Sequence, residues 1–228
     1  MRLATFNIHH GAPAGARKVD LDAMARVCVD LAADVLALQE VDSGVPRSGG
    51  ADLAGVVAEA TGMAVVFGPT LTRDGGLYGN ALLVRGELAD VEHVRLPSDW
   101  RFWVRREPRA AIVATAVVDG ARLSVAGTHL STRRSESGKQ LAAVLEHLGR
   151  RSKPRALIGD LNRRPPEVAE RLARAGFVPA GGAPTFSARR PLIRIDHVAV
   201  NGLRIIDVEV AATQVSDHRP LVVTVEPT

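Results

Sequence analysis

The feature that most constrains this sequence is a pattern that recurs along it, in which a short apolar stretch adjoins polar or charged residues. Asn7, Glu40 and Asp160 each stand at the end of such a stretch, and Asp217 and His218 come directly before one. Adjacent side chains of a strand point to opposite faces, and α/β proteins place their ligands at the ends of strands. The pattern therefore predicts a polar site where several strand ends meet.

The predicted strands far outnumber the predicted helices, and several adjoin through hairpins, as at the turn signal Asp119-Gly120. This balance favours a layered α/β fold with two packed sheets over a single parallel sheet. Apolar residues at helical spacing predict four helices, the first with Asp20 as its N-cap. These helices are expected at residues 21–33, 53–60, 136–148 and 168–175.

Two loops carry unusual residues. Residues 73–80 are rich in glycine and contain Tyr78, the only tyrosine, so we expect a loop that leads into a strand at 81–84. Residues 97–106 contain both tryptophans, Trp100 and Trp103, together with arginines. Aromatic rings beside arginines suit stacking on nucleic-acid bases, and they suit a membrane interface or a protein contact equally well.

The composition is that of an ordinary globular protein, with 46% hydrophobic and 24% charged residues in 228. We expect one domain over residues 1–228, present as a monomer. The first residues lack the pattern of a secretory signal, no apolar run is long enough to span a bilayer, and the single cysteine, Cys28, excludes a disulfide framework. We therefore expect a cytoplasmic protein.

Nearly all of its 29 basic residues are arginine, which suits phosphate recognition but is also typical of a GC-rich genome.

Eight short motifs occur in a fixed order, and together they resemble the endonuclease/exonuclease/phosphatase superfamily, whose fold is that of deoxyribonuclease I. The motifs are Thr5-Phe6-Asn7, Leu38-Gln39-Glu40-Val41, Tyr78-Gly79-Asn80, Glu107-Pro108-Arg109, Thr128-His129-Leu130, Gly159-Asp160-Leu161-Asn162, Ile195-Asp196-His197 and Ser216-Asp217-His218-Arg219-Pro220. The resemblance spans nearly the whole chain. It implies a four-layered α/β/β/α sandwich of two mixed or antiparallel sheets, with an active site at one end.

The resemblance also implies a metal site. Glu40 corresponds to the principal Mg²⁺ ligand, with Asn7 beside it and Asp217 in the same metal region. Oxygen ligands of this kind suit Mg²⁺, with Mn²⁺ as the alternative. Tyr78, Asn80 and Arg109 fall where the family supports the substrate phosphate.

The same comparison implies catalytic roles. Asp160 corresponds to the residue that positions or deprotonates the attacking water, and Asn162 to the residue that orients the phosphate. His218 corresponds to the imidazole that contacts the phosphoryl oxygens, with Asp196 as its carboxylate partner. His129 corresponds to the second histidine of the deoxyribonuclease and sphingomyelinase branches.

The expected activity is Mg²⁺-dependent hydrolysis of a phosphodiester, with nucleic acid as a plausible substrate. A phosphatase or phospholipase-like enzyme acting on a small or lipid phosphoester is the alternative, and an inactive binding protein on this fold is a third. Two positions depart from the family pattern. Asn80 stands where deoxyribonucleases have an acid that pairs with the first histidine, and His9 and its neighbours stand where some apurinic endonucleases have a second carboxylate. The second departure argues against abasic-site repair.

Overall fold

The computed structural model describes residues 1–13, 19–99 and 107–228, and the expected Trp100–Trp103 contact surface lies outside these residues. Two six-stranded sheets pack face to face. The first contains, in spatial order, β11 (Leu203–Val210), β12 (Leu221–Pro227), β1 (Arg2–Asn7), β2 (Val35–Ser43), β4 (Gly76–Val84) and β3 (Ala64–Arg73). The second contains β5 (Glu87–Arg95), β6 (Ala110–Val118), β7 (Ala121–His129), β8 (Arg155–Asp160), β10 (Asp196–Asn201) and β9 (Val178–Pro179).

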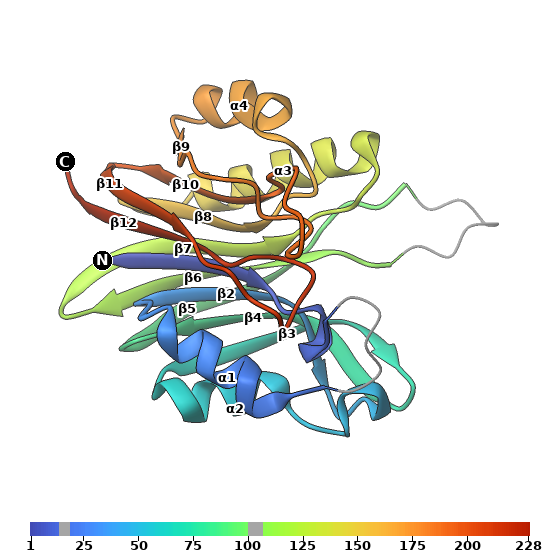
Figure 1. Cartoon of the computed structure of the whole chain (residues 1–228). Helices are drawn as coiled ribbons and strands as arrows, with labels where there is room; N and C mark the ends of the chain where they lie inside the picture. Colours follow the sequence, from blue (N-terminus) through green and yellow to red (C-terminus); the bar gives the residue numbers. More distant parts are fainter. Residues whose placement is uncertain (14–18, 100–106) are drawn as a thin grey trace.

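Helices cover the outer faces of both sheets, so the expected four-layered α/β/β/α sandwich is confirmed (Figure 1). The first sheet packs against α1 (Leu21–Asp30) and α2 (Leu53–Thr61), and the second packs against α3 (Arg134–Gly149) and α4 (Pro165–Arg174). Asp20 caps α1 as expected, because its side chain accepts a hydrogen bond of 2.9 Å from the Ala23 amide. Two short 3-10 turns, η1 (His9–Gly11) and η2 (Pro46–Ser48), follow β1 and β2.

The core has three apolar layers, one between the sheets and one under each pair of helices. Alternating residues of β1 show how the strand serves two of them: Leu3 faces the other sheet, whereas Ala4 and Phe6 face α1 and α2. A strand buried on both faces reads as a continuous apolar run, which is why its polar end residue stands out in the sequence.

The sequence-based prediction of a glycine-rich loop at 73–80 is wrong, because most of it belongs to β4. The turn is only Asp74-Gly75, whose φ angles of 47° and 86° are those of a tight hairpin. Gly79 allows a close approach of two strands, since a Cβ there would lie 2.1 Å from the carbonyl oxygen of Gly68. The glycines therefore let β3 and β4 pair closely, and Tyr78 and Asn80 lie on one face of β4.

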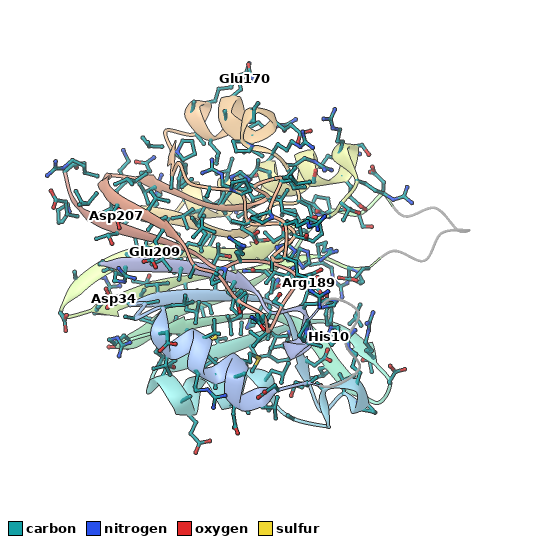
Figure 2. The ribbon with its side chains drawn as sticks, viewed as in Figure 1. His10, Asp34, Glu170, Arg189, Asp207 and Glu209 are labelled. Carbon is teal, nitrogen blue, oxygen red and sulfur yellow. The ribbon has the colours of Figure 1, made fainter. Side chains whose placement is uncertain are left out.

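The strand directions bring the predicted site residues to one end of the sandwich. The parallel pairs β1–β2 and β7–β8 deliver their carboxyl ends there, and the antiparallel strands β10 and β12 begin there. His10 and Arg189 lie toward this end, whereas Asp207 and Glu209 lie toward the other (Figure 2). Among the described residues, no helix is long and apolar enough to cross a membrane.

Candidate active site

The centre of the site is a buried group formed by Asp160, Asp196 and His218, each at most 5% exposed. Asp160 and Asp196 are direct partners across the antiparallel pair β8–β10. His218 Nδ1 lies 2.9 Å from Asp196 Oδ2, and its Nε2 lies 3.8 Å from Asp160 Oδ2. Because a carboxylate only accepts, Nδ1 carries a proton and donates to Asp196.

The charges of this group are strongly coupled. Burial opposes a charge on His218, but the carboxylates of Asp196, Asp160 and Asp217 outweigh it and raise the pKa of His218 to about 10. Burial and the nearby charge of Asp196 raise the pKa of Asp160 to about 7. At neutral pH the imidazole is therefore a cation held beside a carboxyl that is poised to exchange a proton.

A second group of oxygen donors lies next to this centre. The Asn7 amide nitrogen donates to Glu40 Oε1 at 3.1 Å and to Asp160 Oδ2 at 3.2 Å. Ser216 ties the final motif to the same point, because its hydroxyl donates to the Asn7 carbonyl at 2.6 Å and lies 3.5 Å from Asp217 Oδ1. The structure thus brings Asn7, Glu40 and Asp217 to one place.

The donor chemistry of this place fits a divalent cation. Glu40 and Asp217 are half-buried carboxylates, and the Asn7 amide oxygen, which accepts from the His9 N–H at 3.0 Å, keeps a second lone pair. Carboxylate and carbonyl oxygens are the ligands preferred by hard divalent cations. The buried trio also has its ligand atoms within 4.8 Å of one another. A cation there, however, would compete with the charged imidazole of His218, so Glu40 and Asp217 are the better position.

His129 and Asn162 lie on the other side of Asp160. The Asn162 amide nitrogen lies 3.1 Å from His129 Nε2, which in turn lies 3.4 Å from Asp160 Oδ2, and the Asn162 backbone N–H donates to Asp160 Oδ1 at 2.8 Å. Burial lowers the pKa of His129 well below its usual value, and the charges of Arg109 and His218 lower it further. His129 is therefore a neutral imidazole whose Nε2 accepts a hydrogen bond from Asn162.

The three residues expected to support the phosphate have different surroundings. Tyr78 is 4% exposed, and burial together with the charges of Glu40 and Glu107 raises its pKa, so its hydroxyl stays protonated. Arg109 forms an ion pair of 3.0 Å with Glu107 and lies near enough to His129 to affect its charge. Asn80 donates to the Ala110 carbonyl at 3.0 Å, a bond between the two sheets.

Two arginines of this region were not expected from the sequence. Arg47 forms a two-point ion pair with the buried Asp42, at 2.7 and 2.8 Å, and its guanidinium lies 5.5 Å from the centre of the Tyr78 ring. Arg73 lies 5.1 Å from the same ring. These cation–π contacts fix Tyr78 from the outside. Arg47 lies in η2 and Arg73 at the end of β3, and neither segment differs in sequence from other arginine-containing segments of the chain.

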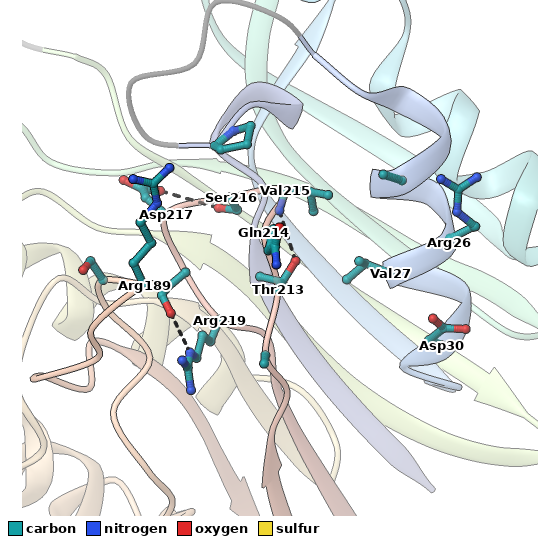
Figure 3. A pocket seen from close by; sticks show the side chains of 15 residues that line it. Arg26, Val27, Asp30, Arg189, Thr213, Gln214, Val215, Ser216, Asp217 and Arg219 are labelled. Carbon is teal, nitrogen blue, oxygen red and sulfur yellow. Dashed lines mark hydrogen bonds between the residues drawn. The ribbon is translucent and has the colours of Figure 1, made fainter.

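A pocket of about 940 Å³ opens beside Asp217, between α1 and the segment around residue 189 (Figure 3). Arg26 lines it from α1, and Arg189 and Arg219 line it from the opposite side. The Arg219 side chain donates to the Ala188 carbonyl at 2.9 Å, which fixes one of these cations. A concave surface with several arginines next to a carboxylate site is suited to an anionic ligand.

A four-layered sandwich with acidic and imidazole side chains at one end defines the class: an α/β protein of the deoxyribonuclease-I-like fold. The model of the Endonuclease/Exonuclease/phosphatase family matches residues 4–218, and the chain belongs to this family. The matched region contains all the predicted site residues.

Solved structures agree with this assignment at the level of the fold. An endonuclease/exonuclease/phosphatase from Beutenbergia cavernae is 23% identical, with a TM-score of 0.83 over 100% of this chain and 71% of that one. The human Nocturnin catalytic domain with a bound sulfate is 20% identical, with a TM-score of 0.74 over 100% and 93%. TDP2 from D. rerio in complex with a single-stranded DNA product is 17% identical, with a TM-score of 0.73 over 99% and 98%. No curated protein matches the sequence.

Proposed function

We propose that this protein is a Mg²⁺-dependent phosphodiesterase, with Mn²⁺ as an alternative ion, and that nucleic acid is its substrate class. The observation that carries the proposal is the position of Asp160. Its carboxyl is buried, bonded to Asn7 beside the cation ligands, and flanked by His129 and His218. Hydrolysis of a phosphoester needs an oriented water, neutralised phosphoryl charge and a donor for the phosphoryl or leaving oxygen, and this arrangement offers a residue for each.

Glu40, Asp217 and Asn7 are the residues that would hold the cation, and the cation would supply positive charge to the phosphoryl oxygens. Asp160 accepts the proton of the attacking water, a role that its pKa of about 7 favours. His218 donates through Nε2 to a phosphoryl oxygen, since its Nδ1 is engaged by Asp196. His129 Nε2 and the Leu130 carbonyl accept the two N–H groups of the Asn162 amide, so Asn162 orients the phosphate by exchanging one of these bonds for a phosphoryl oxygen. Tyr78 supports the phosphate from β4, and Arg109 supports it from the residue before β6.

The fold neighbours add support of a limited kind. The TDP2 structure holds a single-stranded DNA product, and the Nocturnin structure holds a sulfate, an ion with the shape of phosphate. At these identities the likeness extends to the fold alone. The choice of nucleic acid therefore rests on the motifs of the site and on the arginines around it.

A second candidate is a phosphatase acting on a small phosphoester, and the pocket beside Asp217 favours it. A concave space of about 940 Å³ has the size of a small-molecule site, whereas a long nucleic acid needs an open track. In this version Arg26 and Arg189 bind an anionic part of the substrate that does not react.

A substrate panel separates the two candidates. The purified protein is assayed with and without Mg²⁺ on bis-p-nitrophenyl phosphate, p-nitrophenyl phosphate, supercoiled plasmid and single-stranded DNA and RNA. Mg²⁺-dependent cleavage of the diester and of a nucleic acid supports the first candidate. Cleavage of the monoester alone supports the second. Arg189→Ala, compared with the exposed Arg122→Ala, should raise KM without changing kcat only if the pocket binds substrate.

A further inference from the structure

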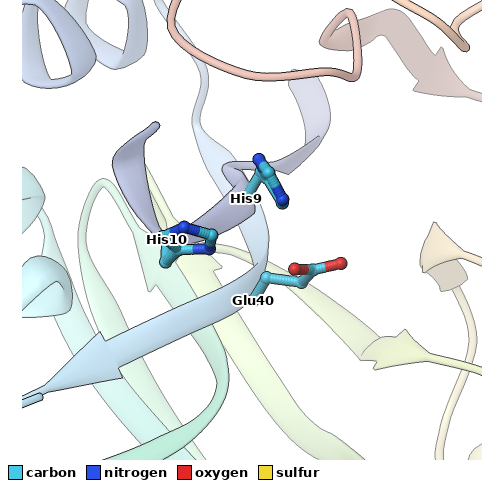
Figure 4. A group of neighbouring side chains, drawn as sticks. All are labelled: His9, His10 and Glu40. Atoms are coloured by element: carbon cyan, nitrogen blue, oxygen red, sulfur yellow. The ribbon is translucent and has the colours of Figure 1, made fainter. Parts of the chain in front are cut away.

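The predicted metal ligand Glu40 has two histidine neighbours that the proposed reaction does not use. His9 and His10 follow β1 in η1, and one ligand atom of each lies within 4.8 Å of the others and of a Glu40 oxygen. Figure 4 shows both rings above β2, on the side from which Glu40 projects. Two nitrogen donors and a carboxylate at this spacing can bind one ion.

The backbone at this place is held in an unusual conformation. His9, His10 and Glu40 all have left-handed φ angles, of 44°, 48° and 58°. Residues other than glycine adopt this conformation at a cost in free energy, and such residues gather at functional sites. Glu40 lies where the pairing of β2 with β4 is irregular between Leu38 and Val41, and such bulges redirect side chains. In this conformation a Glu40 oxygen lies within 4.8 Å of a ring nitrogen of each histidine.

The hydrogen bonds of His9 leave its other ring nitrogen available for an ion. Its Nδ1 lies 2.8 Å from the Ala12 carbonyl oxygen, and a carbonyl only accepts, so Nδ1 carries the hydrogen. Nε2 then keeps its lone pair. A histidine that donates one N–H to a carbonyl and presents the other nitrogen has the usual arrangement of a metal ligand.

His10 has a buried ring nitrogen that nothing in the described part of the chain satisfies. Its Nδ1 is inaccessible to water and has no hydrogen-bond partner there. The rings of His9 and His10 lie 4.4 Å apart at an interplanar angle of 57°, so they contact one another without sharing a hydrogen bond. A buried polar atom without a partner destabilises the fold, and a bound cation would remove that penalty.

We propose that His9, His10 and Glu40 form a metal site of mixed nitrogen and oxygen donors, which binds a first-row transition ion such as Co²⁺ or Mn²⁺ more tightly than Mg²⁺. Mg²⁺ demands oxygen ligands in a nearly ideal octahedron, whereas imidazole nitrogen suits transition ions. This site shares Glu40 with the proposed active site, but its choice of ion is independent of the substrate.

Metal binding by matched variants tests the site directly. Isothermal titration of the metal-free protein with Co²⁺ and with Mg²⁺ is carried out on the wild type, His9→Ala, His10→Ala and Glu40→Gln. We expect Co²⁺ to bind at least about tenfold more tightly than Mg²⁺, and each histidine variant to weaken Co²⁺ at least about tenfold while leaving Mg²⁺ unchanged. His147→Ala is the control, because this side chain is 27% exposed, close to the 28% of His9, and pairs with Glu92 away from the site.

A measurement on the unmutated protein guards against variants that fail to fold. Pulsed electron paramagnetic resonance of the Mn²⁺-loaded wild type should detect nitrogen coupling, which changes when the protein is labelled with ¹⁵N-histidine. Loss of this coupling in His9→Ala/His10→Ala confirms the assignment. Equal Co²⁺ and Mg²⁺ affinities, or a Mn²⁺ spectrum without histidine nitrogen, would overturn the proposal. Asp160→Asn should lower hydrolysis by about 10²–10⁴-fold and keep the nitrogen coupling, so a protein without phosphoesterase activity leaves this result unaffected.

Discussion

The two sides of the site are built in contrasting ways. Asp160, Asp196 and His218 are almost fully buried, and strand pairing and direct hydrogen bonds fix them. His9, His10 and Glu40 are half-exposed and lie in a 3-10 turn and a β-bulge with left-handed backbone. Coupled charges dominate the energetics of the first group, whereas strained backbone conformations dominate those of the second. Proton transfer suits the first, and ion binding suits the second.

The largest expected effect concerns the buried side. Asp160→Asn removes the proposed proton acceptor of the attacking water, so kcat with Mg²⁺ should fall by about 10²–10⁴-fold. The exposed Asp207→Asn is the control and should leave kcat unchanged. A variant that keeps more than a tenth of the wild-type kcat would show that the base lies elsewhere. The buried group would then not be the site of proton transfer.

The same substitution has a consequence for stability. The pKa of Asp160 is about 7 in the folded protein and 3.8 in the reference state. A carboxyl whose pKa is raised on folding contributes stability that is fully present below pH 3.8 and is lost as the pH rises through 7. The free energy of unfolding of Asp160→Asn minus that of the wild type should therefore be larger at pH 8 than at pH 5. Urea unfolding in EDTA measures this difference. An unchanged difference would show that Asp160 titrates normally.

Asp196→Asn is expected to have the next largest effect. It should lower the free energy of unfolding by about 1.5–3 kcal/mol at pH 7, because His218 loses its charged hydrogen-bond acceptor. The wild-type pKa of His218 is raised from 6.5 to about 10, so its contribution to stability is complete below pH 6.5 and disappears as the pH rises through 10. In the variant this decline should occur at lower pH. The His218 ring resonance, titrated by NMR, measures the pKa directly, and an unshifted titration would contradict the pairing.

The contrast also explains how much could be predicted from the sequence. Asp160, His129 and Asn7 end strands whose apolar residues identify them, so the two-sheet fold and the convergence of these residues could be predicted from periodicity and motif order. The structure places Asn7 in hydrogen-bond contact with Asp160 and His129 Nε2 at 3.4 Å from it, while the roles of these residues remain predictions. The single-sequence pattern does not show the bulge at Glu40, because the pairing of β2 with β4 produces it, and it does not show the left-handed turn residues His9 and His10. The expected loop at 73–80 failed for the same reason.

The smallest effect is expected on the side of His9, His10 and Glu40, and it distinguishes the two sides of the site most directly. Glycine adopts a left-handed backbone without strain, so His10→Gly, where φ is 48°, should stabilise the metal-free protein by about 1 kcal/mol. Asp119→Gly, at a φ of 49° in the β6–β7 turn, is the matched control outside the proposed metal site.

Added Co²⁺ should make the wild type more stable than His10→Gly, the reverse of their order without metal. An ion that binds only the folded state stabilises it more when it binds more tightly. The wild type then gains more than His10→Gly, whereas Asp119→Gly should gain as much as the wild type. Thermal unfolding in EDTA and in excess Co²⁺ measures both orders. If His10→Gly were the less stable protein in EDTA as well, contacts of the imidazole would already offset the backbone strain. The left-handed conformation of His10 would then be explained without a bound ion.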